Sequence, residues 1–115
     1  MWTSWPARRV LVRGPSMAPT LADGDVVLGC FRRRRPAAGD VVLVSFSARP
    51  GQLSVKRAVH PDGAGWHVLG DFEAVSTDSR TLGPAQVVAV VPVRLWPKPQ
   101  RLRRRRPDLG EVTVR

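Results

Sequence analysis

The chain alternates short runs of β-branched and apolar residues with polar segments that are rich in glycine and proline. These runs predict strands at residues 9–13, 26–30, 40–46, 53–60, 66–69 and 86–95. Pro92 would interrupt the last strand or place it at a sheet edge. No window of ten or more residues carries an apolar stripe with helical spacing. We therefore expect an all-β domain, a small and partly closed sheet with no substantial helix.

Two segments fall outside this alternation. Residues 70–84 are polar, acidic and rich in hydroxyl groups, and such long loops in compact domains are usually functional or disordered. Beyond residue 97 the chain consists largely of proline and arginine and offers little to bury. We expect a domain over residues 1–97, followed by a basic, disordered tail over residues 98–115. Deleting that tail should then leave the fold and the chemistry intact.

Composition adds a strong positive charge to this picture. The 115 residues are 43% hydrophobic, enough for one modest core, and carry a net charge of +10. Much of it lies in two arginine runs, 32–35 and 101–106, which are either solvated loops or surfaces for anionic partners. Neither run is interleaved with aromatic residues, so we expect no specific nucleic-acid binding. Cys30 is the only cysteine and lies in an apolar run, which is typical of a buried structural thiol.

Nothing in the chain predicts insertion into a membrane. The longest uncharged apolar stretch, residues 87–93, is far too short to cross a bilayer. The first nine residues lack the apolar core of a secretory signal. We expect a cytoplasmic protein without a transmembrane segment, either free or held at the inner face of the membrane by its basic tail.

Lysine is rare in this chain, since only two of the 19 basic residues are lysines. Arginine stays protonated in proteins, whereas a desolvated lysine can lose its proton near neutral pH. Lys56 stands inside the predicted strand 53–60, with Ser54 and Ala58 on its face and Arg57 on the other. Each face thus carries one basic residue. Alternation alone does not decide whether Lys56 is buried or guards a strand edge.

Ser16 is distinguished from the other serines by its position between Pro15 and Pro19, just after the first predicted strand. The two prolines fix two φ angles and stiffen the turn, which could hold the hydroxyl and the N–H of Ser16 toward a cleft. An ordinary turn serine fits the local sequence equally well.

A Ser-His-Asp site is the rival chemistry. His60 and His67 flank a predicted hairpin loop, with Asp62 and Asp71 nearby, but no nucleophile-elbow motif accompanies them. Two histidines are too few ligands for a zinc site. We expect neither a metal nor a cofactor.

Four segments, taken in order, resemble the motifs of the type I signal peptidase family of serine-lysine proteases. They are Ser16-Met17-x-Pro19-Thr20-Leu21, Gly39-Asp40-Val41-Val42, Val55-Lys56-Arg57-x-Val59, and Gly70-Asp71 with Ser76-x-Asp78-Ser79-Arg80-x-x-Gly83. Each motif alone is modest, whereas four in the family order are a strong match. The resemblance covers residues 10–93.

This resemblance implies a signal-peptidase-type fold and a serine endopeptidase. Ser16 would be the nucleophile and Lys56 the general base. Ser76 would hold the lysine amine, and Asp78 and Arg80 would form a supporting ion pair. The Ser16 N–H would stabilise the oxyanion.

Some positions depart from the family pattern. Gly14 stands where many members carry a serine as second oxyanion donor, which leaves that donor open, and Phe72 replaces the usual asparagine after Gly-Asp. Met17 would contact the substrate. We expect no counterpart of the family's membrane anchor or of its large second domain. In this small form the chain most resembles the nickel-type superoxide dismutase maturation proteases, which remove a short N-terminal leader.

The resemblance therefore implies an endopeptidase that removes an N-terminal leader or signal segment from a protein substrate, with the nickel superoxide dismutase precursor as candidate. One alternative is general signal peptide processing at the membrane, with the basic tail as a peripheral contact. Another, from a different class, is a non-catalytic basic β module that binds nucleic acid or acidic protein.

Overall fold

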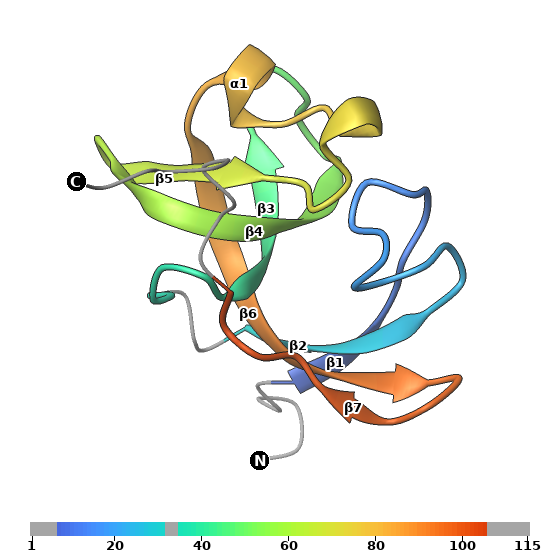
Figure 1. Cartoon of the computed structure of the whole chain (residues 1–115). Helices are drawn as coiled ribbons and strands as arrows, with labels where there is room; N and C mark the ends of the chain where they lie inside the picture. The colour runs from blue at the N-terminus through green and yellow to red at the C-terminus, as the bar shows by residue number, and fades with distance from the viewer. Residues whose placement is uncertain (1–6, 32–34, 106–115) are drawn as a thin grey trace, which may run out of the picture.

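The computed structural model describes residues 7–31 and 35–105, in which one antiparallel sheet curls into a partly closed ring (Figure 1). The strands are β1 (Ala7–Leu11), β2 (Val26–Cys30), β3 (Val41–Phe46), β4 (Leu53–Asp62), β5 (Gly65–Leu69), β6 (Ala85–Trp96) and β7 (Gln100–Arg101). A 3₁₀ turn (Glu73–Val75) and a short helix, α1 (Ser79–Leu82), are the helical elements of the described residues. The predicted all-β class is confirmed, and so is the lack of a substantial helix.

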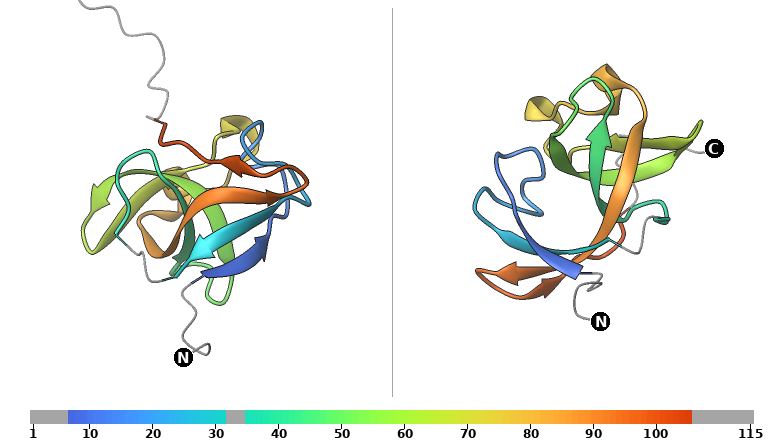
Figure 2. Two further views of the ribbon diagram at one scale, coloured as in Figure 1. Left: turned by 90° about the horizontal axis from the view of Figure 1, so that it is seen from below. Right: turned by 180° about the vertical axis from the view of Figure 1, so that it is seen from behind.

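The long strand β6 organises the sheet, whose order is β1-β2-β6-β3-β4-β5. β6 also pairs with β5 through Ala85 and Trp66, which draws the sheet toward a ring (Figure 2). Pro92 lies within β6 and does not end it. The register between β2 and β6 shifts between Cys30–Val90 and Leu28–Val93, so Pro92 occupies an irregular stretch of the ladder, where a missing N–H is tolerated.

Strand β3 separates two hydrophobic cores, which explains why all its residues except Ser45 are apolar. Val41 and Leu43 join the first core, while Val42, Val44 and Phe46 join the second. The other buried members of the first core are Val12, Met17, Leu21, Val27, Ala89 and Val91. Those of the second are Ala58, Val68, Ala85 and Val87. Because successive strand residues point to opposite faces, burial on both faces favours apolar residues at successive positions, and Ser45, the polar exception, is half-buried.

The prediction that a tail begins at residue 98 is wrong as far as residue 105. β7 pairs with the end of β6 through Arg101 and Val93. Leu102 packs against the first core, and its N–H donates to the carbonyl of Pro92 at 2.7 Å. The composition of this segment did not predict its order, because its contacts with the domain come largely from one leucine and from backbone groups.

Charged groups tie the same segment to the loop before β3. Arg104 Nε donates to Asp40 Oδ1 at 2.6 Å, and Arg105 N donates to the carbonyl of Gly39 at 3.0 Å. The folded domain therefore extends at least to Arg105. The remainder of the predicted tail, 106–115, and the arginines at 32–34 lie outside the described residues.

Truncation tests this boundary. We expect a chain that ends at residue 97 to lose roughly 2–4 kcal/mol of unfolding free energy, because Leu102 leaves the core and Asp40 loses Arg104. A chain that ends at Arg105 keeps these contacts and serves as the control. Urea unfolding of both chains measures the difference. Equal unfolding free energies would show that the segment 98–105 adds nothing to the fold.

Candidate functional site

Lys56 is buried, with 4% of its surface exposed, in the middle of β4. The ladder between β4 and β5 begins at Arg57–Leu69, so the two strands diverge at the lysine. The segment that follows β5 contacts the side chain of Lys56 from this open side, through Ser76. The structure thus decides what alternation left open, because both faces of β4 are covered here.

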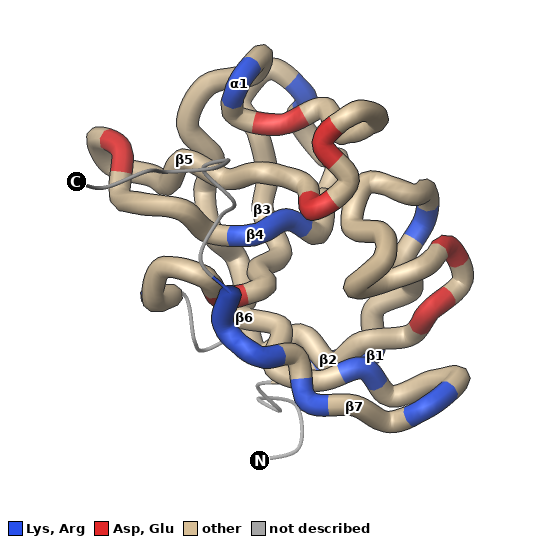
Figure 3. Tube along the Cα trace, in the orientation of Figure 1, with Lys and Arg blue, Asp and Glu red and all other residues tan. Residues whose placement is uncertain are grey.

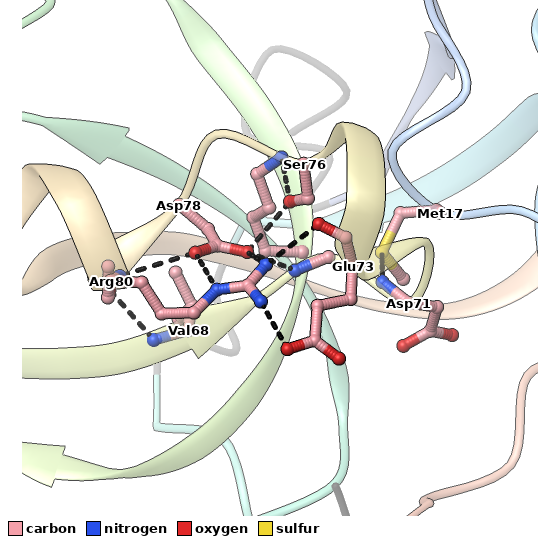
Figure 4. A network of polar contacts seen from close by, with 10 residues as sticks. Met17, Val68, Asp71, Glu73, Ser76, Asp78 and Arg80 are labelled. Carbon is pink, nitrogen blue, oxygen red and sulfur yellow. Dashed lines mark hydrogen bonds and ion pairs between the residues drawn. The ribbon is translucent and has the colours of Figure 1, made fainter. Parts of the chain in front are cut away.

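A chain of hydrogen bonds orients the Lys56 amine. Nζ donates to Ser76 Oγ at 3.4 Å, and Ser76 Oγ donates to Asp78 Oδ2 at 2.8 Å. An ionised carboxylate only accepts, so the Ser76 proton points to Asp78 and the Ser76 oxygen faces the amine as an acceptor. Figure 4 shows Ser76 and Asp78 side by side, with Arg80 reaching the same carboxylate.

Asp78 is the centre of this network and is 1% exposed. Its carboxylate accepts from Gly70 N at 2.9 Å and from the Arg80 guanidinium at 2.8 and 2.9 Å, besides Ser76. Burial acts to raise the pKa of Asp78, but the hydrogen bonds from Arg80, Gly70 and Ser76 outweigh it and lower the pKa to about 2. The expected ion pair between Asp78 and Arg80 is present, and Arg80 also pairs with Glu73 at 2.7 Å.

The segment 70–84 is held in one conformation by its own polar side chains. Asp78 caps helix α1, accepting from Arg80 N. Ser79 Oγ accepts from Val68 N of β5 at 2.9 Å, which ties the helix to the sheet. Gly83 ends the helix with a φ of 77°. Hydroxyl-rich composition predicted a functional or disordered loop, and these bonds make it an ordered one.

Gly70 lets the Ser16 turn and the Ser76 segment meet. A methyl group at this position would lie 2.6 Å from the carbonyl oxygen of Ser16 and would overlap the side chain of Ser76. Nearby, Phe72 N donates to the same carbonyl at 2.8 Å. The motif comparison included Gly70 without a role, and only the packing of three distant segments reveals one.

The amine of Lys56 has a lowered pKa. Burial is the main cause, and the positive charges of Arg49 and Arg80 act in the same direction. The negative charge of Asp78 acts against them, but it reaches the amine across Ser76 and does not reverse the shift. A lysine in this setting carries a neutral amine at lower pH than a lysine in water.

Ser16 and Lys56 line the same groove, which has a volume of about 440 Å³. One wall comes from residues 10–13, at the end of β1 and just after it. The other comes from the turn between β3 and β4 and from the first residues of β4. Among the described residues, the Lys56 amine donates to Ser76 and not to Ser16, and the Ser16 hydroxyl and N–H have no hydrogen-bond partner.

Met17 also lines the groove, but it is 1% exposed and packs in the first core. Its Sδ accepts from Asp71 N at 3.4 Å. The side chain thus supports the floor of the groove and presents little surface to a ligand, so its predicted contact with substrate stays a prediction.

A second buried ion pair fixes the start of the segment 70–84. Arg57, 3% exposed, binds Asp71 Oδ2 at 2.6 Å and also donates to the carbonyls of Gly39 and Arg103. Burial acts to raise the pKa of Asp71, but the hydrogen bonds from Arg57 and Thr20 lower it. Arg57 therefore joins β4 to the segment 70–84 and to the segment 98–105. The sequence motif did not reveal this role.

The rival residues lie elsewhere. His60 and His67 stack on the β4–β5 hairpin with ring centroids 5.0 Å apart, and neither lines the groove. Within residues 7–31 and 35–105, no cluster of three or more His, Cys, Asp or Glu side chains is placed to hold a metal. Cys30 is a half-buried free thiol. In the same part of the chain, no helix is long and apolar enough to cross a membrane.

The chain matches no protein-family model and none of the curated proteins with which it was compared. The groove combines a serine hydroxyl with a buried amine whose pKa is lowered by burial. Such a pair can perform nucleophilic catalysis with lysine as the base.

Acid stability tests the Asp78 network. The pKa of Asp78 is about 2 in the folded chain and ~3.9 in an unfolded one, so its stabilising contribution is present above pH 4 and is lost as pH falls toward 2. We expect Asp78→Asn to lower the unfolding free energy at pH 7 by roughly 2–3 kcal/mol and to flatten its fall between pH 4 and 2. Urea unfolding across this pH range measures both. An unchanged pH dependence would contradict the assigned network.

Proposed function

We propose that this protein is a serine endopeptidase in which Ser16 is the nucleophile and Lys56 the general base. The observation that carries the proposal is the buried Lys56 amine, held by Ser76 in the groove that Ser16 lines. A neutral amine has two N–H groups and one lone pair. With one N–H donated to Ser76, the lone pair remains to accept a proton.

The reaction follows from these roles. As Ser16 Oγ attacks the substrate carbonyl carbon, its proton moves to Lys56 Nζ and the carbonyl oxygen becomes an oxyanion. The ammonium then protonates the leaving nitrogen, the C–N bond breaks, and an ester to Ser16 remains. Water, deprotonated by the same amine, attacks the ester. This step releases the acid product and restores the Ser16 hydroxyl.

The oxyanion needs hydrogen-bond donors. The N–H of Ser16 lacks a partner among the described residues and is the first donor. Gly14 offers no side chain, and its N–H already donates to Asp23 Oδ1 at 2.7 Å. The second donor is then a water molecule or a group of the substrate complex.

The groove fits an extended peptide. Among the described strands, β1 pairs only with β2, and residues 53–56 of β4 pair only with β3, so both walls present strand edges with unused backbone groups. Leu11 and Leu53, each about half exposed, add apolar surface. A strand added between such edges gains main-chain hydrogen bonds. This supports cleavage within an extended leader or signal segment, for which the nickel superoxide dismutase precursor is the substrate proposed from the resemblance.

Cleavage of a diverse peptide pool, read by mass spectrometry, tests the proposal. We expect new peptide termini with the wild-type chain and at least about 1,000-fold slower appearance with Ser16→Ala, because the nucleophile is lost. Ser47→Ala, in the exposed turn after β3, is the matched control and should cleave at the wild-type rate. Equal products from Ser16→Ala and the wild type would rule out Ser16 as the nucleophile.

The base has its own test. Lys56→Arg should lose at least about 100-fold in kcat/KM although charge is retained, because arginine does not become a neutral base. In the wild type, kcat/KM should rise with pH and level off at an apparent pKa below the ~10.4 of free lysine, since the deprotonated form is active. Substantial activity in Lys56→Arg, or a rate that falls with rising pH, would contradict the role.

The basic surface favours the second candidate, a module that binds anionic partners. Figure 3 shows basic residues along β7 and the segment after it, where Arg101, Arg103 and Arg105 are exposed. A chain without protease activity, but with nucleic-acid affinity that falls steeply with salt, would support this reading. Affinity for anionic vesicles with retained cleavage would support processing at a membrane surface.

A further inference from the structure

The groove is one-sided in charge. Arg13, Arg49 and Lys56 line it, and no aspartate or glutamate of residues 7–31 and 35–105 does. Arg13 and Arg49 are exposed, and among the described residues neither forms an ion pair. The arginines that order the site differ, because Arg57 and Arg80 are bound to aspartates. Two guanidinium groups thus face a peptide-sized groove without a counter-ion from the described part of the chain.

Both cations lie close to the reacting groups. Arg13 precedes Ser16 by three residues, in the segment that leads from β1 into the Ser16 turn. Arg49 is near enough to Lys56 for its charge to lower the pKa of the amine. A guanidinium presents a planar fork that binds a carboxylate with two hydrogen bonds, and a partly desolvated groove strengthens such pairs.

We propose that the groove selects extended segments that carry an acidic side chain close to the scissile bond, with Arg13 and Arg49 as the residues that determine this specificity. The cleavage part rests on the proposed function, whereas the binding preference does not. The apolar side chains of Leu11 and Leu53 accept the neighbouring small or apolar residues of the same segment. The substrate class is thus an extended acidic-apolar peptide, distinct from a purely apolar one.

Binding to the Ser16→Ala chain tests the preference without turnover. The probes are capped ten-residue peptides of alternating alanine and threonine with a rhodamine label, in which one Asp is moved along the length. Each has a matched peptide with Asn at the same place. We expect at least one Asp position to bind about tenfold tighter than its Asn match by fluorescence anisotropy. When Arg13→Gln and Arg49→Gln are added to the Ser16→Ala chain, the Asp and Asn peptides should bind equally well.

A charge-matched control separates a local contact from general attraction. Arg101→Gln with Arg103→Gln removes two exposed charges outside the groove, and the Asp preference should persist. Equal binding of Asp and Asn peptides at every position would overturn the inference. So would loss of the Asp preference in the Arg101→Gln, Arg103→Gln control to the same extent as in the groove variant. Wild-type cleavage sites without flanking acidic residues would overturn it and leave the endopeptidase standing. Acid-selective binding by a chain that cleaves nothing would support it and contradict the endopeptidase.

Discussion

The buried carboxylate of Asp78 is the constraint on which the site depends. In a medium of low polarity a carboxylate is tolerated only when donors surround it, and here the donors come from Gly70, Ser76 and Arg80. Each donor fixes a part of the site. Gly70 holds the end of β5 against the Ser16 turn, Arg80 closes the loop, and Ser76 is left with only its oxygen to offer to Lys56.

Two electrostatic effects compete at Lys56, and their balance sets the chemistry. Desolvation favours the neutral amine, while the charge of Asp78 favours the ammonium. Direct contact with Asp78 would form a permanent ion pair and a poor base. Ser76 stands between the two groups, and Arg80 offsets much of the negative charge, so burial prevails. Arg57 stabilises the burial of Lys56, because its ion pair with Asp71 anchors the segment 70–84 to β4.

The sequence foretold the strands well, because alternation and turn residues are local signals, and β2 matches its expected range. It could not decide the burial of Lys56, which depends on a segment closing over β4 from a distance. The role of Gly70 was hidden for the same reason, since close approach of three segments leaves no local pattern. The predicted domain boundary at residue 97 was wrong because it was drawn from composition. Leu102 and backbone hydrogen bonds hold β7 and the segment after it, and composition does not reveal such contacts.

The protonation of Lys56 is the most direct test of whether the fold prepares this amine as a base. The chain has only two lysines, so lysine labelled with ¹³C gives two Cε signals, and Lys56→Arg identifies which belongs to Lys56. NMR titration of the intact chain then follows that signal alone. We expect a midpoint clearly below the ~10.4 of lysine in water, and a higher midpoint when Arg49 is replaced by glutamine. A midpoint at or above ~10.4 would contradict the claim that the fold prepares Lys56 as a base.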